Sequence, residues 1–348
     1  MRIVPRISRR TALLLAGLLL LAAAPETPGP RGSAPVLGLD VNLAAGTPAA
    51  EQQRAFDLAR RTGASLYAMT LSWAAAERSP GKYELKDITR AARSLRQSGA
   101  QLHLDLPLVA GRQRDVPADL AGVAFDDPRL SLRLGKLLDA LEPALRDFST
   151  LSLGYEADAY FADKPEELRA YRRLFDGAVS YLSKKSPRLK VGVTTASPTE
   201  SPAPAVAAAL HQKSPVLFYI YSPFQSGRPY LQRDPDSLER DWKDLLAASG
   251  DRPIAFPEVS YSSAPENSST PEKQAEFVRR MRRLLTAADG RRLLFARYVS
   301  WRDVPGEPLP SVATELERRR AAFFSHRGLQ AADGAAKAAW RAWVKAGT

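Results

Sequence analysis

The chain is organised around the sequence LSLGYEADAYF, residues Leu151–Phe161. Its first half is an apolar run of strand length, and this run leads directly into the acidic residues Glu156 and Asp158. The stretch PIAFPEVSY, Pro253–Tyr261, has the same design, because a short apolar run ends on one acid, Glu258. If three strand–helix units separate the two stretches, both glutamates reach the same rim of one barrel.

Short apolar runs alternate with longer helical patterns along the chain, which is typical of a parallel sheet built from strand–helix units. The predicted strands are Val36–Asn42, Ser65–Trp73, Gln101–Leu108, Thr150–Glu156, Leu189–Thr195, Val216–Tyr221, Pro253–Val259 and Arg292–Trp301. Helices are predicted near Pro48–Arg61, Leu85–Ser98, Pro128–Phe148, Pro165–Ser183, Ala205–His211, Pro235–Ala248 and Pro271–Thr286, and from about Ser311 onward. This order predicts an α/β fold with a single (β/α)8 TIM barrel domain over residues 36–348. An open doubly wound sheet is the alternative, but no glycine-rich phosphate loop follows any predicted strand.

The N-terminus has the pattern of an export signal. Four arginines in the first ten residues precede the apolar run Thr11–Ala24, which is shorter than a bilayer-spanning helix needs to be. Arg9 and Arg10 directly before the apolar run resemble a twin-arginine signal. We therefore predict a signal peptide or N-terminal anchor over residues 1–24 and a linker over residues 25–35. The protein is then periplasmic or secreted, and it contacts a membrane only through an uncleaved signal.

The composition excludes several classes of protein. The chain has no cysteine, so it has no disulfide, thiolate nucleophile, Cys-ligated metal or lipidated cysteine. Its histidines, His103, His211 and His326, are far apart, so we expect no metal site and no cofactor. Four charges of the net +12 belong to the N-terminal arginines, and the other basic residues are spread along predicted helices without interleaved aromatic residues, so nucleic-acid binding is not expected. The absence of a Gly-x-Ser-x-Gly motif argues against a serine hydrolase.

The active site of a (β/α)8 barrel lies at the C-terminal ends of its strands, so the residues at these positions are the candidate site. Acids, indoles and phenols are concentrated there. The candidate substrate-binding residues are Asp40, Trp73, His103, Asp105, Tyr155, Asp158, Tyr219, Tyr221, Tyr261 and Trp301. Aromatic faces pack on the apolar faces of sugar rings, and carboxylates accept hydrogen bonds from hydroxyl groups. The set therefore predicts an oligo- or polysaccharide substrate.

Glycoside hydrolysis is the reaction that needs two carboxyl groups in one site. One group donates a proton to the leaving oxygen, and the other attacks the anomeric carbon or activates a water molecule. The two groups are about 5–5.5 Å apart in retaining enzymes and about 6.5–9.5 Å apart in inverting enzymes. We expect Glu156 and Glu258, at the ends of the fourth and seventh predicted strands, to meet over the centre of the barrel as this pair.

Three further segments carry, together with the two glutamates, a resemblance to a known family. The segments are LSWAAAERSPGKYE (Leu71–Glu84), PEVSYSSAPENSSTPEKQAEFVRRM (Pro257–Met281) and GLQAADGAAKAAWRAW (Gly328–Trp343). In this order they resemble the clan-A retaining glycoside hydrolases, a superfamily of (β/α)8 enzymes that includes the endo-β-galactanases. The resemblance implies that Glu156 is the general acid/base and Glu258 the nucleophile. It also implies that the protein cleaves a β-linked glycan by double displacement.

One position departs from the pattern of this superfamily. The residue before the acid is usually Asn, which hydrogen-bonds the sugar 2-hydroxyl, and here that residue is Tyr155. Contacts to the 2-hydroxyl strengthen in the transition state, so the loss of one costs roughly a few kcal/mol of catalysis. The alternative function is therefore a TIM-barrel sugar-binding protein of the cell envelope with weakened or no catalysis.

Some residues allow two interpretations. Glu156 is either the catalytic acid or an exposed acid that caps a loop, and Glu258 is either the nucleophile or the partner of a nearby arginine. His103 and Asp105 alternate with leucines and therefore share one face of their strand. They form either a pair that faces the mouth of the barrel or a buried hydrogen-bonded pair. We expect the protein to act as a monomer.

Overall fold

The computed structural model describes residues 34–41, 47–306, 309–310 and 312–345. Within these residues the strands of the main sheet have the order β7-β6-β3-β2-β1-β13-β12-β9-β8. The consecutive segments β7 and β8 stand at the two ends of this order, and both fall in the predicted strand Leu189–Thr195. The parallel sheet is thus nearly closed, and the predicted (β/α)8 barrel class is confirmed.

The strands lie where the sequence predicts them, although several are shorter than predicted. The strands of the main sheet are β1 (Val36–Leu39), β2 (Leu66–Thr70), β3 (Gln101–Asp105), β6 (Thr150–Ser152), β7 (Lys190–Gly192), β8 (Thr194–Ala196), β9 (Leu217–Tyr221), β12 (Ile254–Val259) and β13 (Leu293–Tyr298). Two antiparallel hairpins are formed by β4 (Val109–Ala110) with β5 (Gln113–Arg114), and by β10 (Phe224–Gln225) with β11 (Arg228–Gln232).

The predicted helices are present, and two short helices, α2 and α5, add to them. The helices are α1 (Ala49–Arg61), α2 (Trp73–Ala76), α3 (Lys86–Gln97), α4 (Pro128–Leu145), α5 (Ala157–Asp163), α6 (Pro165–Lys185), α7 (Pro204–His211), α8 (Ser237–Ala248), α9 (Pro271–Ala287), α10 (Glu315–Ser325) and α11 (Ala338–Lys345). Several begin at a proline or behind a capping side chain. Thr314, for example, forms a capping box with Glu317 at the start of α10.

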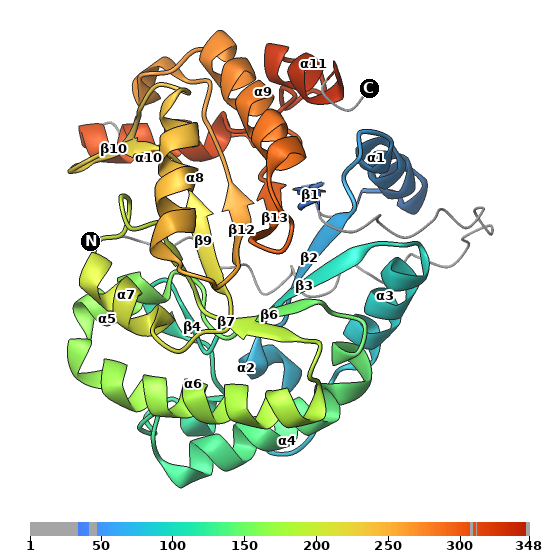
Figure 1. Cartoon of the computed structure of the whole chain (residues 1–348), viewed down its shortest axis with the longest axis vertical. Coiled ribbons are helices and arrows are strands. Elements are labelled where there is room, and N and C mark those ends of the chain that lie inside the picture. Colours follow the sequence, from blue (N-terminus) through green and yellow to red (C-terminus); the bar gives the residue numbers. More distant parts are fainter. Residues whose placement is uncertain (1–33, 42–46, 307–308, 311, 346–348) are drawn as a thin grey trace. The chain divides into compact units, whose positions relative to one another are not determined.

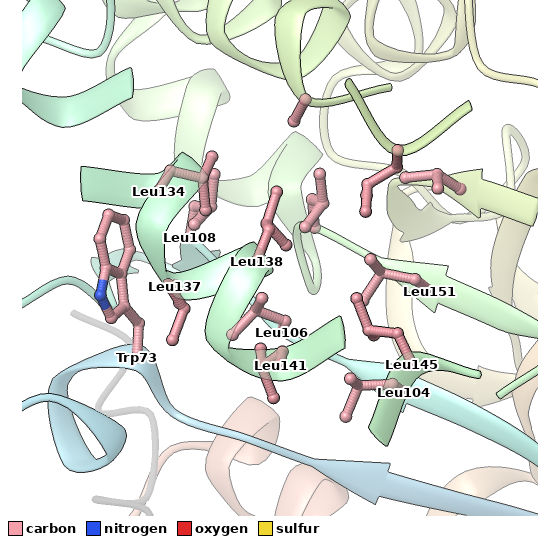
Figure 2. Packing of buried hydrophobic residues seen from close by; sticks show 14 of the residues in the cluster. Trp73, Leu104, Leu106, Leu108, Leu134, Leu137, Leu138, Leu141, Leu145 and Leu151 are labelled. Carbon is pink, nitrogen blue, oxygen red and sulfur yellow. The ribbon is translucent and has the colours of Figure 1, made fainter. Parts of the chain in front are cut away.

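The described chain divides into two compact units, one of residues 67–218 and one of residues 34–66 and 219–345. In the first unit α4 and α6 run side by side (Figure 1). Leu104 and Leu106 lie against the leucines of α4, and all of these side chains are buried (Figure 2). Because successive strand residues point to opposite faces, His103 and Asp105 point away from α4, toward the inside of the barrel.

In the second unit α8 and α9 cover the strand β12. The indole of Trp242 in α8 stacks on Phe256 of β12, with ring centroids 4.4 Å apart. The helix α11 lies along α9 (Figure 1). Its Trp343 is fully buried and donates a hydrogen bond from Nε1 to Thr62 Oγ1 at 2.7 Å. The C-terminal helix therefore belongs to the core of this unit.

The predicted export signal and most of the predicted linker lie outside the described residues, so these two assignments stay predictions. In the part of the chain that the structure describes, no helix is long and apolar enough to cross a membrane.

Candidate active site

Glu258 lies near the end of β12, and its side chain is only 13% exposed. Arg327, which follows α10 in sequence, donates a hydrogen bond from Nη1 to Glu258 Oε1 at 2.6 Å. A guanidinium at this distance favours the ionised form of a carboxyl group. The Glu258 carboxyl group therefore lies against a guanidinium in a position that is poorly exposed to solvent.

Asp40 directly follows β1, and an arginine of the intervening strand β13 connects it to β12. Arg297 of β13 contacts Asp40 Oδ1 at 3.3 Å, and its Nε donates to the carbonyl of Pro257 at 2.8 Å. A Cβ atom at Gly38 would lie 2.9 Å from the Arg297 side chain, so glycine leaves the space that this arginine occupies. The Asp40 side chain is 40% exposed and remains a candidate ligand contact.

Glu156 lies at the end of the predicted fourth strand, where the backbone changes direction. The regular strand β6 ends at Ser152, but main-chain hydrogen bonds continue to Tyr155, which accepts from Gly111 N and donates to Val109 O, both at 2.9 Å. Glu156 then has φ 48° and ψ 41°, and α5 begins at the next residue. Positive φ is uncommon outside glycine, and residues held there are often functional. The Glu156 side chain is exposed to solvent.

Asp158 is two residues further along and is fully buried. Its carboxyl group accepts hydrogen bonds from Ala196 N at 3.1 Å and from Ser201 Oγ at 2.5 Å. Burial raises the pKa of Asp158, and the two hydrogen bonds act in the opposite direction. Asp158 thus ties α5 to the segment after β8 and has no surface for substrate, contrary to its expected role as a sugar contact.

His103 and Asp105 form a buried hydrogen-bonded pair, which is one of the two arrangements that the sequence allows. His103 Nε2 lies 3.1 Å from Asp105 Oδ1, and His103 Nδ1 lies 2.8 Å from Thr150 Oγ1. The edge of the imidazole faces Phe218, with ring centroids 5.0 Å apart. Both ring nitrogens therefore have partners inside the barrel, and a stabilising role explains the pair.

The structure places Trp73 in the core and not at the mouth of the barrel. The strand β2 ends at Thr70, and Ser72 caps the short helix α2, which begins with Trp73. The indole is fully buried near the leucines of α4 (Figure 2), and its Nε1 donates to Glu77 Oε2 at 2.7 Å. Trp73 offers no ring face to a sugar and is left out of the candidate site.

Tyr219 and Tyr221 of β9 also face the helices. Tyr221 is fully buried, and its hydroxyl donates to Asp241 Oδ2 of α8 at 2.8 Å. Tyr219 is 6% exposed, and burial raises its pKa to about 12. The alternate residue Phe218 packs on His103, inside the barrel. Tyr219 and Tyr221 thus face the helices and not the inside of the barrel, which is the opposite of the predicted orientation.

Tyr261 and Trp301 are the remaining aromatic candidates, and both are buried. The hydroxyl of Tyr261 donates to Arg233 O at 2.8 Å, and its ring stacks on Phe277 of α9. Trp301 packs near Trp340 of α11, with ring centroids 6.2 Å apart. Neither ring is available as a sugar platform. Tyr155, Asp40 and the two glutamates are the predicted residues that the structure leaves accessible, fully or in part.

Arg327 is the residue of this site that sequence reasoning missed. Its contact with Glu258 spans 69 residues of sequence, and it lies outside the strand ends where ligand contacts were expected. The signal that points to it is its place directly before the glycine of the Gly328–Trp343 segment. Among the described residues, no group of three or more His, Asp or Glu side chains is arranged to hold a metal ion.

Solved structures with the same fold are glycoside hydrolase barrels. GH5_18 from Streptomyces cattleya, solved with GlcNAc, has a TM-score of 0.63 at 14% identity, over 90% of this chain and 80% of that one. GH5_18 from Bifidobacterium longum subsp. infantis has a TM-score of 0.62 at 15% identity, over 91% and 79%. The exo-β-1,4-mannosidase Op5Man5 from Opitutaceae bacterium strain TAV5 has a TM-score of 0.63 at 14% identity, over 94% and 62%. The sequence matches no protein-family profile and no curated protein.

Proposed function

We propose that this protein is a retaining glycoside hydrolase that cleaves a β-linked glycan. The observation that carries the proposal is the difference between two glutamates at strand ends of a barrel. Glu258 is nearly buried and paired with Arg327, and Glu156 is exposed on a residue of positive φ. Parallel strands of such a barrel end at one face, where the active site lies. The fold shared with glycoside hydrolases supports the same reaction.

In the proposed mechanism the carboxylate of Glu258 attacks the anomeric carbon while Glu156 donates its proton to the leaving glycosidic oxygen. The glycosidic C–O bond breaks, and a covalent ester between the sugar and Glu258 forms. Glu156, now ionised, removes a proton from water, which attacks the anomeric carbon and releases Glu258. The sugar leaves with its original configuration, and both carboxyl groups return to their starting states.

The substrate class is proposed from the neighbours. A GH5_18 enzyme from Bifidobacterium longum subsp. longum was solved with Manβ1-4GlcNAc, and Op5Man5 is an exo-β-1,4-mannosidase. We therefore place β-mannosides and β-linked GlcNAc-containing oligosaccharides first among the substrates to be tested. The basic, apolar N-terminal segment supports action in the periplasm or outside the cell.

A second candidate is a sugar-binding protein that does not cleave its ligand. Tyr155 motivates it, because this residue stands directly before Glu156, where the resembling enzymes have an asparagine. Saturable oligosaccharide binding in calorimetry, without release of reducing ends by the wild-type protein, would favour this candidate.

The test of the proposed function is a screen of β-linked oligosaccharides and aryl β-glycosides, read as released reducing ends or aryl alcohol. The wild type is compared with Glu258→Gln, which keeps the shape of the side chain and removes the nucleophile. We expect turnover by the wild type and none by the variant, with a cooperative thermal unfolding transition in both proteins. Hydrolysis that survives in Glu258→Gln would refute the assignment.

A further inference from the structure

We propose that Arg327 is the positioning residue for Glu258, and that the segment His326–Gly328 is built to hold its guanidinium on that carboxylate. The inference deepens the proposed function and rests on it for the role of Glu258. All residues involved belong to the same compact unit.

The contact between Arg327 and Glu258 is short and poorly exposed to solvent. Nη1 and Oε1 are 2.6 Å apart, and the two side chains are 19% and 13% exposed. Charges interact more strongly where water is excluded, and a carboxylate that loses its partner there takes up a proton more readily. A nucleophile must be ionised at the working pH. Arg327 supplies the charge that keeps Glu258 in this form.

Aromatic rings confine the guanidinium from another side. The Cζ atom of Arg327 lies 4.9 Å from the ring centroid of Phe324 and 5.9 Å from that of Phe323, both in α10. A planar guanidinium stacks favourably on such rings, and fewer orientations remain open to it. The end of α10 therefore restricts the direction in which the Arg327 side chain extends.

The backbone around Arg327 is fixed by groups from other elements. Each carbonyl oxygen of the segment accepts a hydrogen bond: His326 O from Ser263 N at 3.0 Å, Arg327 O from the Tyr298 hydroxyl at 3.1 Å, and Gly328 O from Gln274 Nε2 at 3.2 Å. Gln274 and Tyr298 are fully buried. These hydrogen bonds from buried donors to the three carbonyl oxygens give the segment one defined position, although Gln274 Oε1 and Arg327 Nε have no partner.

Gly328 shows that this position allows no side chain. A Cβ atom there would lie 2.0 Å from Asp303 N, which is far inside van der Waals contact with backbone. The Gly328 N–H donates to Asp303 Oδ1 at 2.8 Å, and Lys337 Nζ contacts both carboxylate oxygens of Asp303 at 3.1 Å. The glycine, the aspartate and the lysine thus lock the segment that carries Arg327 against the chain after β13.

The charges on the neighbouring segments are paired with each other. Asp40 of the β1 end pairs with Arg297 of β13, and Asp303 pairs with Lys337 before α11. Two further titratable residues close to the segment are His326, whose carbonyl accepts from Ser263 Oγ, and Tyr298, whose hydroxyl donates to Arg327 O. Arg327 donates its Nη1–H to Glu258 Oε1 and forms a further ion pair beside these two.

The experiment measures the titration of Glu258 directly, by carboxylate infrared or 13C NMR difference spectra between each protein and its Glu258→Gln counterpart. Arg327→Met removes the charge and keeps a similar apolar stem. We expect the proton affinity of Glu258 to increase by about tenfold to a hundredfold. Arg327→Lys should restore part of the loss. The acidic limb of the pH profile of kcat/KM should move by the same amount in the same direction.

Gly328→Ala provides a second, independent variant, because it changes neither Glu258 nor Arg327. It should shift the Glu258 titration in the same direction, since the added Cβ displaces the segment. Arg320→Met is the matched control. Arg320 also lies on an aromatic ring of α10, 5.4 Å from the centroid of Phe324, and it should leave the titration unchanged.

An unchanged Glu258 titration in Arg327→Met overturns the inference; if that variant does not fold, Arg327→Gln replaces it in the same measurement. A shift of the titration in a protein that cleaves no glycoside supports the positioning role and refutes the proposed function. The two failures are therefore distinguishable. An ion pair without a role in the reaction would also shift the Glu258 titration and lower the unfolding midpoint, but the acidic limb of the kcat/KM profile would stay where it is.

Discussion

The two glutamates occupy opposite kinds of surroundings. Glu258 lies within a regular strand, is nearly buried, and contacts an arginine that a dense clamp holds in place. Glu156 lies beyond the end of its strand, in a left-handed backbone conformation, and is exposed. The nearby carboxyl group that is buried, Asp158, binds the backbone and a serine instead of a cation.

This difference matches the two tasks of a retaining hydrolase. A nucleophile has to stay charged and fixed in position. A nearby guanidinium favours the charged form and, through its hydrogen bond, also fixes the carboxylate. A general acid/base has to gain and lose a proton in each cycle, and the exposed position of Glu156 gives water access to it. The comparison therefore favours the same two roles that the family resemblance implies.

The largest expected effect is that of removing the nucleophile. Glu258→Ala should lower kcat/KM by about 10⁶-fold, the size seen when a covalent nucleophile is removed from another hydrolase. Glu266→Ala, an exposed glutamate on the following loop, should leave kcat/KM unchanged. Steady-state kinetics on the substrate found in the screen measures both. Substantial turnover in Glu258→Ala would remove the distinction between the two glutamates.

Removal of the general acid should lower turnover less than removal of the nucleophile, and the loss should depend on whether the leaving group needs a proton. Glu156→Ala should lower turnover of natural glycans by about 10²- to 10⁴-fold. Dinitrophenyl glycosides, whose leaving group needs no proton, should still react in the first step, and azide should accelerate the second. Glu166→Ala, an exposed acid at the start of α6, is the control. Equal losses on both kinds of substrate would contradict the role of Glu156.

Tyr155 allows a test of how the residue before Glu156 affects catalysis. Tyr155→Asn should raise kcat/KM by about tenfold to a hundredfold, if asparagine there supplies the contact that strengthens in the transition state. Tyr155→Phe, which lacks the hydroxyl but adds no amide, should give no such gain. Kinetics with a substrate and its 2-deoxy analogue separates the two, since only the former carries the hydroxyl in question.

The strand end that carries Glu156 also depends on a glycine. A Cβ atom at Gly154 would lie 2.9 Å from the Tyr171 hydroxyl, which is buried and donates to Leu153 O. Gly154→Ala should lower the free energy of unfolding by about 1–3 kcal/mol, as measured by urea unfolding. Gly135→Ala, in the interior of α4 with no atom near its Cβ position, should be neutral or stabilising. A neutral Gly154→Ala would show that this strand end is loosely packed.

The smallest expected effect concerns Asp158. Its pKa is raised in the folded protein, so between the unfolded and folded pKa values the folded state binds more protons than the unfolded state. The free energy of unfolding therefore decreases as the pH rises through this window, relative to Asp158→Asn, which does not titrate there. The difference in unfolding midpoint between the two proteins, measured from low to neutral pH, checks this. A difference that is independent of pH would contradict the raised pKa.

The fold could be predicted from the sequence because strands and helices alternate with clear turn residues between them. The sequence does not predict which residues of a buried strand face the inside of the barrel. Phe218 and Tyr219 are both apolar enough to face either side of a strand that is covered on both faces, so their order in the sequence does not tell which side is the interior. Tyr219 and Tyr221 were therefore assigned to the wrong face.

The position of a candidate residue is predicted best where it lies within a regular strand. Glu258 lies in β12 as expected. Trp73 and Trp301 were misplaced because β2 and β13 end three residues before them, at Thr70 and Tyr298, and the chain has turned by then. Arg327 is brought to Glu258 only by long-range packing, which no local pattern encodes.

Identification of the covalent intermediate tests most directly whether Glu258 is the nucleophile. An activated 2-deoxy-2-fluoro β-glycoside of the sugar found in the screen is incubated with the protein, and the labelled peptide is mapped by mass spectrometry. The proposed mechanism predicts one label, on Glu258, with none in Glu258→Gln. A label on another carboxylate, or glycan hydrolysis with inversion and no label, would contradict it.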